Sequence, residues 1–282
     1  MSTEAAGPAG ASSGRPGTPD AAPGPIRQAI EGLGEQLIQS IATLGGIPLL
    51  GVRVLREAVR PPFRVSHLFS QLDFVGVGSI FIVLLTGLFT GMVFAQQTQS
   101  AFALFDAESL VGPTVGLTLT RELGPVFTAL MVTMRAGSAM CTELGTMRVT
   151  EQVDALETMA VNPVQYLLVP RVLAGLMMVP VLNMLFVTAG MTGAFLIAVG
   201  VNGLSAGTFL ARTREWLVPM DLAEGLIKAA IFGLVVALIG CFKGYNATGG
   251  AKGVGKATTE AMVSSALAIF VLDYIVGALI HA

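Results

Sequence analysis

Long apolar stretches alternate with short charged ones along this chain of 282 residues. Five of the apolar stretches reach about 20 residues or more, the length that an α-helix needs to cross the hydrocarbon core of a bilayer. The pattern therefore predicts an all-α, polytopic integral membrane protein. The five predicted spans are Phe74–Ala95, Leu110–Met140, Val172–Val201, Leu222–Phe242 and Ala261–Ile280.

Composition supports the same class. Hydrophobic residues make up 53% of the chain and charged residues 12%, whereas ordinary soluble domains carry about twice that charged fraction. The net charge of -2 offers no basic face for a nucleic acid, so we expect no nucleic-acid partner. Cys141 and Cys241 are too few and too far apart for a disulfide framework or a metal site, and we expect them to serve packing.

The N-terminal region differs from the rest. Residues 1–25 are mainly Ala, Gly, Pro and Ser, and we expect a disordered tail because such a segment buries too little apolar surface. Residues 26–65 show apolar residues at helical spacing, with Arg53, Arg56 and Arg60 near the end of the segment. This pattern predicts amphipathic helices in the membrane interface. A helical hairpin docked on the protein would give the same pattern, so both interpretations stay open.

Arg121 and Glu122 interrupt the second span, where each charge costs roughly 2.5–3.5 kcal/mol of insertion free energy. Adjacent residues on a helix do not face each other, so the two should find different partners. Pro125 frees a backbone carbonyl in the same turn. The segment predicts either a polar notch for a lipid headgroup or an internal structural ion pair.

Further charges lie in the last two spans. Glu224 and Lys228 are four residues apart, a spacing that allows them to pair and so offset the cost of burying either charge. Asp273 lies in the fifth span and needs a partner there, for which Arg121 and Lys228 are the candidates.

The segment Glu143–Pro163 is the longest charged stretch between two apolar runs. Val149, Val153 and Leu156 recur at the spacing of one helical stripe, which predicts a single helix over about 143–161, ended by Asn162 and Pro163. Its charged residues project away from that stripe. The helix is either an ordinary solvated helix or a docking surface for a partner.

Basic residues set the predicted orientation. One side of the membrane would carry Arg53, Arg56, Arg60, Arg64, Arg148, Arg171, Lys243, Lys252 and Lys256, and the other chiefly Arg212 and Arg214. Because the side richer in Lys and Arg is cytoplasmic, the N-terminus should be cytoplasmic. Five spans then place the C-terminus in the periplasm.

Residues 250–256 match the G-x-x-x-x-G-K pattern of phosphate-binding loops. Ala257 stands where such a loop needs the Ser or Thr that binds Mg²⁺, and the segment follows a membrane helix, not a strand. We therefore predict no nucleotide site here. The segment should be a flexible connection, with Thr258 or Thr259 capping the last helix.

Three segments together resemble the permease subunit of the MlaE/YrbE family, the membrane half of ABC-type lipid transporters. They are Arg121–Pro125, Glu143–Pro163 and Gly253–Thr259, and the resemblance runs from about Asp73 to the C-terminus. It implies a permease domain over 66–282 in the bacterial inner membrane. It also implies a set of partners: a second copy of the chain, a cytoplasmic ABC ATPase dimer, an MCE-domain lipid-binding protein and, as a further candidate, a small STAS-type accessory subunit.

The resemblance also implies roles for single residues. Arg121, Glu122 and Asp273 would lie along the path of the lipid, between the inner membrane and the outer envelope. The ATPase would dock on the segment 143–161, and the ATP would be bound by that partner, so this chain itself should need no cofactor or metal. The residues implied for docking are Glu143, Arg148, Glu151, Asp154 and Glu157.

No arrangement of nucleophile, base or metal ligands in the sequence points to an enzyme. Two functions compete with the ABC permease. An ion-driven secondary transporter would use Glu122, Lys228 and Asp273 as a relay. A membrane scaffold without transport would need the charged segment for assembly only.

Overall fold

The computed structural model describes residues 45–61 and 65–281. The predicted tail over 1–25 and the beginning of the predicted interfacial segment lie outside these ranges. All regular elements within the described ranges are helices, which confirms the all-α prediction for this part of the chain.

Five helical runs among the described residues are long and apolar enough to cross a membrane. Each run contains one predicted span and extends beyond it, so the prediction of five spans is confirmed. The longest runs exceed the thickness of a hydrocarbon core at about 1.5 Å per residue, so they must tilt or project from it. The runs are Val65–Phe105, Glu108–Val149, Val164–Val201, Pro219–Tyr245 and Gly250–Ile280.

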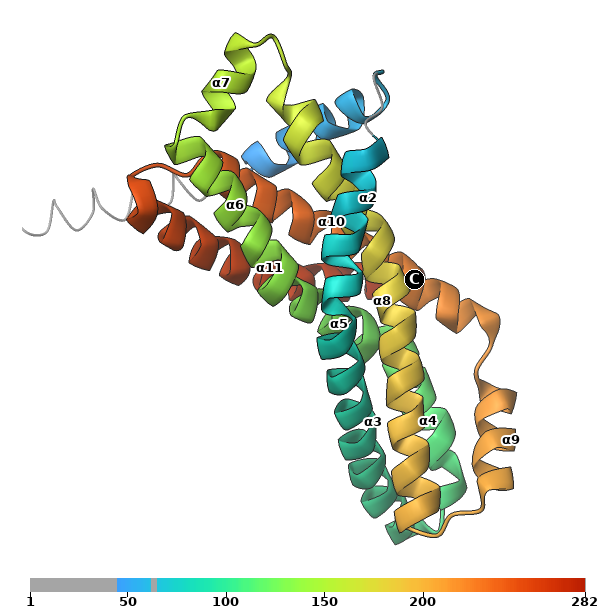
Figure 1. The fold of residues 1–282 in the computed structure, drawn as a ribbon. Helices are drawn as coiled ribbons and strands as arrows, with labels where there is room; N and C mark the ends of the chain where they lie inside the picture. The colour runs from blue at the N-terminus through green and yellow to red at the C-terminus, as the bar shows by residue number, and fades with distance from the viewer. Residues whose placement is uncertain (1–44, 62–64, 282) are drawn as a thin grey trace, which may run out of the picture. The chain divides into compact units, whose positions relative to one another are not determined.

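The runs are built from shorter elements, shown in Figure 1. The first run joins α2 (Val65–Val75) to α3 (Ile80–Phe102), and the second joins α4 (Val111–Thr118), α5 (Gly124–Val132) and α6 (Ser138–Val149) through π-helical turns at Leu119–Leu123 and Thr133–Gly137. The third holds α8 (Val169–Phe195) between π-helical turns at Val164–Leu168 and Leu196–Val201. The remaining elements are α7 (Gln152–Thr158), α9 (Ala206–Trp216), α10 (Pro219–Tyr245) and α11 (Gly250–His281).

Two apolar clusters form the interior. The larger one joins α3, α4, α5, α8 and α10 through residues such as Leu119, Phe186 and Phe232. The second cluster joins α6, α7, α8, α10 and a helix over residues 45–58, and its buried members include Val54, Leu144, Val153, Val172 and Cys241. Helix α10 contributes to both clusters, so it connects the two halves of the interior.

Helices α3 and α8 run side by side and touch backbone to backbone (Figure 1). A Cβ atom placed on Gly91 of α3 would lie 1.9 Å from the carbonyl oxygen of Gly190 in α8. Small residues at such a contact let two membrane helices approach closely. Gly91 therefore sets the distance between the first and third spans.

Substituting Gly91 with alanine is expected to destabilise the protein by about 1–3 kcal/mol, because the added methyl group meets backbone and not a movable side chain. Thermal denaturation in detergent would measure the effect. Gly255→Ala in α11 is the control, since a Cβ there would meet nothing within 4 Å. Equal melting temperatures for the two variants would contradict the close contact.

The segment 143–163 differs from the single helix predicted for it. Helix α6 ends at Val149, Glu151 adopts a left-handed backbone with φ of 61°, and α7 begins at Gln152. The reversal brings Val153 into the second cluster and allows Arg148 to pair with Asp154. Tertiary contacts, and not the helical spacing of the apolar residues, thus determine where α6 ends and α7 begins. We call residues 150–163 the α7 projection.

Two connections also differ from prediction. The predicted outer loop Asn202–Asp221 contains α9, whose first turn is capped by the Ser205 side chain. Helix α11 begins at Gly250, so the predicted cap at Thr258 or Thr259 is wrong. Their hydroxyls donate to carbonyls within the helix. Gly249, directly before α11, and Gly250, its first residue, have φ of 86° and 66°, which residues with side chains rarely adopt.

The helix over 45–58 corresponds to the second part of the predicted interfacial segment. Leu50 and Val54 are buried in the second cluster, so one face packs on the protein. Leu49, Val52 and Leu55 lie exposed on other faces. The interfacial location of those exposed side chains stays a prediction.

Candidate functional site

Six charged side chains from three spans meet inside the protein. We call them the charged cluster. Two come from the π-helical turn between α4 and α5, three from the first half of α10 and one from α11. The members are Arg121, Glu122, Asp221, Glu224, Lys228 and Asp273.

The π-helical turn follows from the local sequence. The N–H of Gly124 donates to the carbonyl of Leu119, five residues back, and Pro125 has no N–H to donate. The carbonyl of Thr120 therefore receives no bond from Gly124 or Pro125. It faces α10, where a Cβ on Gly225 would lie only 2.1 Å away. The turn thus brings Arg121 and Glu122 close to the charges of α10.

Arg121 binds the start of α10. Its Nε donates to Asp221 Oδ1 at 2.8 Å, and its Nη2 donates to the same oxygen. The other oxygen of Asp221 accepts the backbone N–H of Val218 at 2.9 Å and so caps the first turn of α10. Glu224 lies 3.8 Å from Arg121 Nε. The arginine therefore links the second span to the beginning of the fourth.

Lys228 is fully buried and lies among three carboxylates. Its Nζ donates to both oxygens of Glu122 at 2.8 Å, and lies 3.7 Å from Glu224 and 3.6 Å from Asp273. Arg121 and Glu122 thus have different main partners, as predicted. Of the two partners considered for Asp273, the structure shows Lys228. The spacing of Glu224 and Lys228 also gives the predicted contact.

The cluster has an inner and an outer part. Lys228, Asp221 and Glu224 are almost completely buried. The side chains of Glu122, Arg121 and Asp273 are 42%, 35% and 23% exposed. These three are the residues predicted for the lipid path. The reachable part of the cluster therefore combines guanidinium donors with carboxylate acceptors, which suits a polar ligand carrying both signs of charge.

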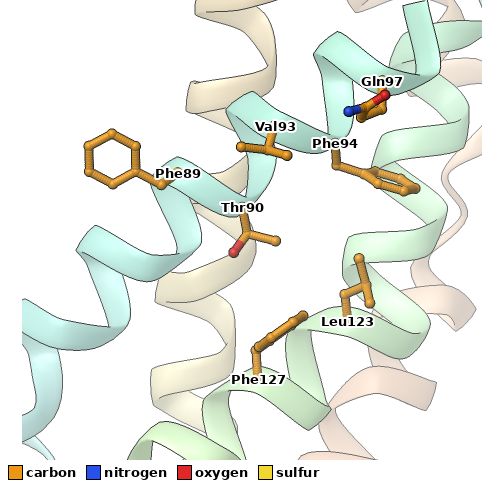
Figure 2. Close-up of a pocket in the computed structure, with 7 residues that line it drawn as sticks. All are labelled: Phe89, Thr90, Val93, Phe94, Gln97, Leu123 and Phe127. Carbon is orange, nitrogen blue, oxygen red and sulfur yellow. The ribbon is translucent and has the colours of Figure 1, made fainter.

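An apolar cavity of about 570 Å³ lies between α3 and the start of α5. Leu123, the residue after Glu122, lines it together with Phe127, while α3 contributes Phe89, Thr90, Val93, Phe94 and Gln97. Figure 2 shows Phe94 directed toward the second span near Leu123, whereas Phe89 points away from it. We call this cavity the α3–α5 groove. Its mostly hydrocarbon lining suits an acyl chain.

Sequence reasoning missed two parts of this site. Asp221 was assigned to the end of a loop, although a Pro at the first helical position followed by an acidic residue is a known sign of a helix start. The α3–α5 groove gave no signal in the sequence, because its walls come from two spans whose register is set only by packing.

The residues predicted for docking fall into two groups. Glu151, Asp154 and Glu157 are exposed on the α7 projection. Glu143 and Arg148 lie on α6: Glu143 Oε2 is 2.8 Å from Arg171 Nη2, and Arg148 pairs with Asp154 and lies over the ring of Tyr245. The structure therefore brings the three acidic residues together at the tip of the α7 projection and places Glu143 and Arg148 at the base of that projection.

Comparisons with a family model and with individual proteins both match this chain to permeases. The family model described as "Permease MlaE" matches residues 68–279. An intermembrane phospholipid transport system permease protein, MlaE, of Haemophilus influenzae is 38% identical over 255 residues, covering 89% of this chain and 96% of that protein. A probable ABC transporter permease protein of Rickettsia bellii is 38% identical over 244 residues, covering 86% and 94%. The chloroplast protein TRIGALACTOSYLDIACYLGLYCEROL 1 of Arabidopsis thaliana is 35% identical over 231 residues, covering 82% and 66%.

Proposed function

Since this chain belongs to the MlaE permease family, we propose that it is the membrane subunit of an ABC-type transporter that moves phospholipids between the inner membrane and the outer envelope. The resemblance stated from three sequence segments is thereby confirmed at the level of the family. Two observations support the proposal: the apolar α3–α5 groove, and the partly exposed charged residues Arg121 and Glu122, which directly precede the groove residue Leu123 in the second span. An apolar groove and a set of charged side chains on the same span match the two ends of a phospholipid.

In this proposal the headgroup meets Arg121, Glu122 and Asp273 while an acyl chain occupies the groove. Arg121 would bind the phosphate, since its planar guanidinium forms paired hydrogen bonds with phosphate oxygens. Glu122 and Asp273 would face any ammonium group of the headgroup. Leu123 and Phe127 follow Glu122 on the same helical segment, so headgroup and chain sites are connected through one stretch of backbone.

The α7 projection would be the docking surface for a separate cytoplasmic ATPase, which binds the ATP. The support is its exposure: Glu151, Asp154 and Glu157 extend from the spans on a short helix, and only Val153 of α7 is fully buried. In this proposal the N-terminus lies in the cytoplasm and the C-terminus in the periplasm. A second copy of the chain, an MCE-domain protein and a STAS-type subunit would complete the assembly.

Reversing the exposed charges of the projection tests the proposal. Glu151→Lys with Glu157→Lys reverses two exposed charges of the docking surface and is expected to prevent co-purification of the ATPase, and with it ATP hydrolysis. Neither residue has an ion pair among the described residues, so the substitutions should not disturb the fold. The matched control is Asp106→Lys with Glu108→Lys on the turn before α4, where Asp106 also has a left-handed backbone. The control should retain the ATPase.

Two outcomes would reject the proposal. The first is an unaltered chain that purifies without any ATPase yet moves lipid in a proton gradient. It would favour the ion-driven transporter, for which the structure does bring Glu122, Lys228 and Asp273 together. The second is an assembled complex whose loss leaves the lipid distribution unchanged, which would favour the scaffold.

A further inference from the structure

Among the buried charged residues of the described chain, Arg171 is the one outside the charged cluster. It lies in the first turn of α8 and is 4% exposed. Its Nη2 is 2.8 Å from Glu143 Oε2 on α6, and its Nη1 donates to the carbonyl of Leu167 at 2.7 Å. A buried guanidinium loses its hydration, so its position requires an explanation beyond packing.

The ion pair closes the base of the α7 projection. Helix α6 enters the projection, and α8 follows it after the π-helical turn Val164–Leu168. Both α6 and α8 pack against α10. The second cluster lies in the same region and includes Leu144, Val153 and Val172 from α6, α7 and α8. A displacement of α7 is therefore transmitted to the second and third spans through these contacts of α6 and α8.

The two partners are unequally exposed. The Glu143 side chain is 54% exposed, whereas that of Arg171 is 5% exposed. Removing Arg171 leaves a solvated carboxylate, which costs little. Removing the charge of Glu143 leaves a buried cation whose remaining acceptor, among the residues that the structure describes, is the carbonyl of Leu167, and this costs more. The buried Arg171 thus fixes the position of the ion pair, and Glu143 neutralises the buried charge.

We propose that Arg171 is a positioning residue that makes α6 and α8 move as one unit when a partner displaces the α7 projection. The inference rests on the function proposed above and deepens it, because it names the link between the docking surface and the second and third spans. Arg171 touches neither the lipid path nor the exposed tip of the projection. Its role is to transmit movement, not to bind the lipid or the partner.

The first test uses the intact complex with its ATPase in phospholipid vesicles. Arg171→Met is expected to keep the ATPase bound and hydrolysing, while lipid moved per ATP hydrolysed falls by about 2- to 30-fold, the range for residues that carry coupling between sites. Arg171→Lys, which keeps the charge, should recover part of the loss. Arg212→Met on α9, where the arginine pairs with Glu215 at an exposed site, is the control.

The outcomes separate this inference from the proposed function. If Arg171→Met hydrolyses ATP and moves lipid in the wild-type ratio, the inference is wrong and the permease assignment stands. If the unaltered complex itself moves no lipid, the proposed function fails. A loss of ATPase binding in Arg171→Met would show a merely structural role and would also overturn the inference.

A second measurement tests the link without the ATPase. Spin labels on exposed Thr146 of α6 and Met177 of α8 report the distance between the two helices, with the buried Cys141 and Cys241 replaced by alanine. The distribution is expected to broaden in Arg171→Met and in Glu143→Gln, and to stay narrow in Arg171→Lys. An unchanged distribution in Arg171→Met would contradict the inference.

Discussion

Replacing Lys228 with methionine is expected to remove most of the folded protein from the membrane. The Lys228 ammonium is fully buried and lies within 3.7 Å of carboxylate oxygens from Glu122, Glu224 and Asp273. Without it, these carboxylates face one another in a region of low dielectric. Removing one partner of a buried ion pair costs about 3–5 kcal/mol, a large share of the stability of a typical protein. Thermal denaturation in detergent and the amount of protein in the membrane would measure the loss.

Two further variants make this prediction specific. Lys252→Met, at the exposed start of α11, should leave the free energy of unfolding within about 0.5 kcal/mol of wild type, as surface substitutions usually do. Adding Glu122→Gln and Asp273→Asn to Lys228→Met should restore part of the stability, because removing both sides of a buried pair costs less than removing one. If Lys228→Met alone is as stable as wild type, the charged cluster does not hold the spans together.

Much of the charged cluster could be anticipated from the sequence. Charges inside apolar spans are costly and must be paired, so the contact of Glu224 with Lys228 followed from their spacing. For Asp273 the sequence left Arg121 and Lys228 as candidates, and the structure shows Lys228. The pairing of Arg121 with Asp221 did not follow from the sequence. It depends on the π-helical turn at Leu119–Leu123, whose extra residue rotates Arg121 relative to the rest of its span. Hydrophobic periodicity does not report such a local change.

The break in the segment 143–163 was hidden for a different reason. No glycine or proline marks Thr150 and Glu151, and the apolar stripe continues through them. The break is stabilised by contacts made after the chain reverses, namely the burial of Val153 and the pairing of Arg148 with Asp154. A pattern confined to one segment cannot include the free energy of contacts with α6 and α10. The number and order of the membrane spans follow from local hydrophobicity and were predicted, although each helical run is longer than its predicted span.

Filling the α3–α5 groove should stop lipid movement without disturbing the α7 projection. Leu123→Trp would place an indole between α5 and α3, where Leu123, Phe94 and Phe127 line an open apolar groove of about 570 Å³ (Figure 2). If an acyl chain occupies that space, a tenfold loss of lipid transfer corresponds to about 1.4 kcal/mol of lost interaction, which is less than full burial of one large apolar side chain contributes. We therefore expect at least about a tenfold loss.

The design of this experiment separates a blocked groove from a damaged fold. Thr90→Trp fills the same space from the opposite wall and should have the same effect. Phe81→Trp, on an exposed part of α3 outside the groove, should transfer lipid like wild type. All three variants should still bind the ATPase, because the groove and the α7 projection are built from different elements. Lipid transfer at the wild-type rate by both Leu123→Trp and Thr90→Trp would show that the acyl chain takes another route. The charged cluster would then have to be reassigned as an internal structural link between spans.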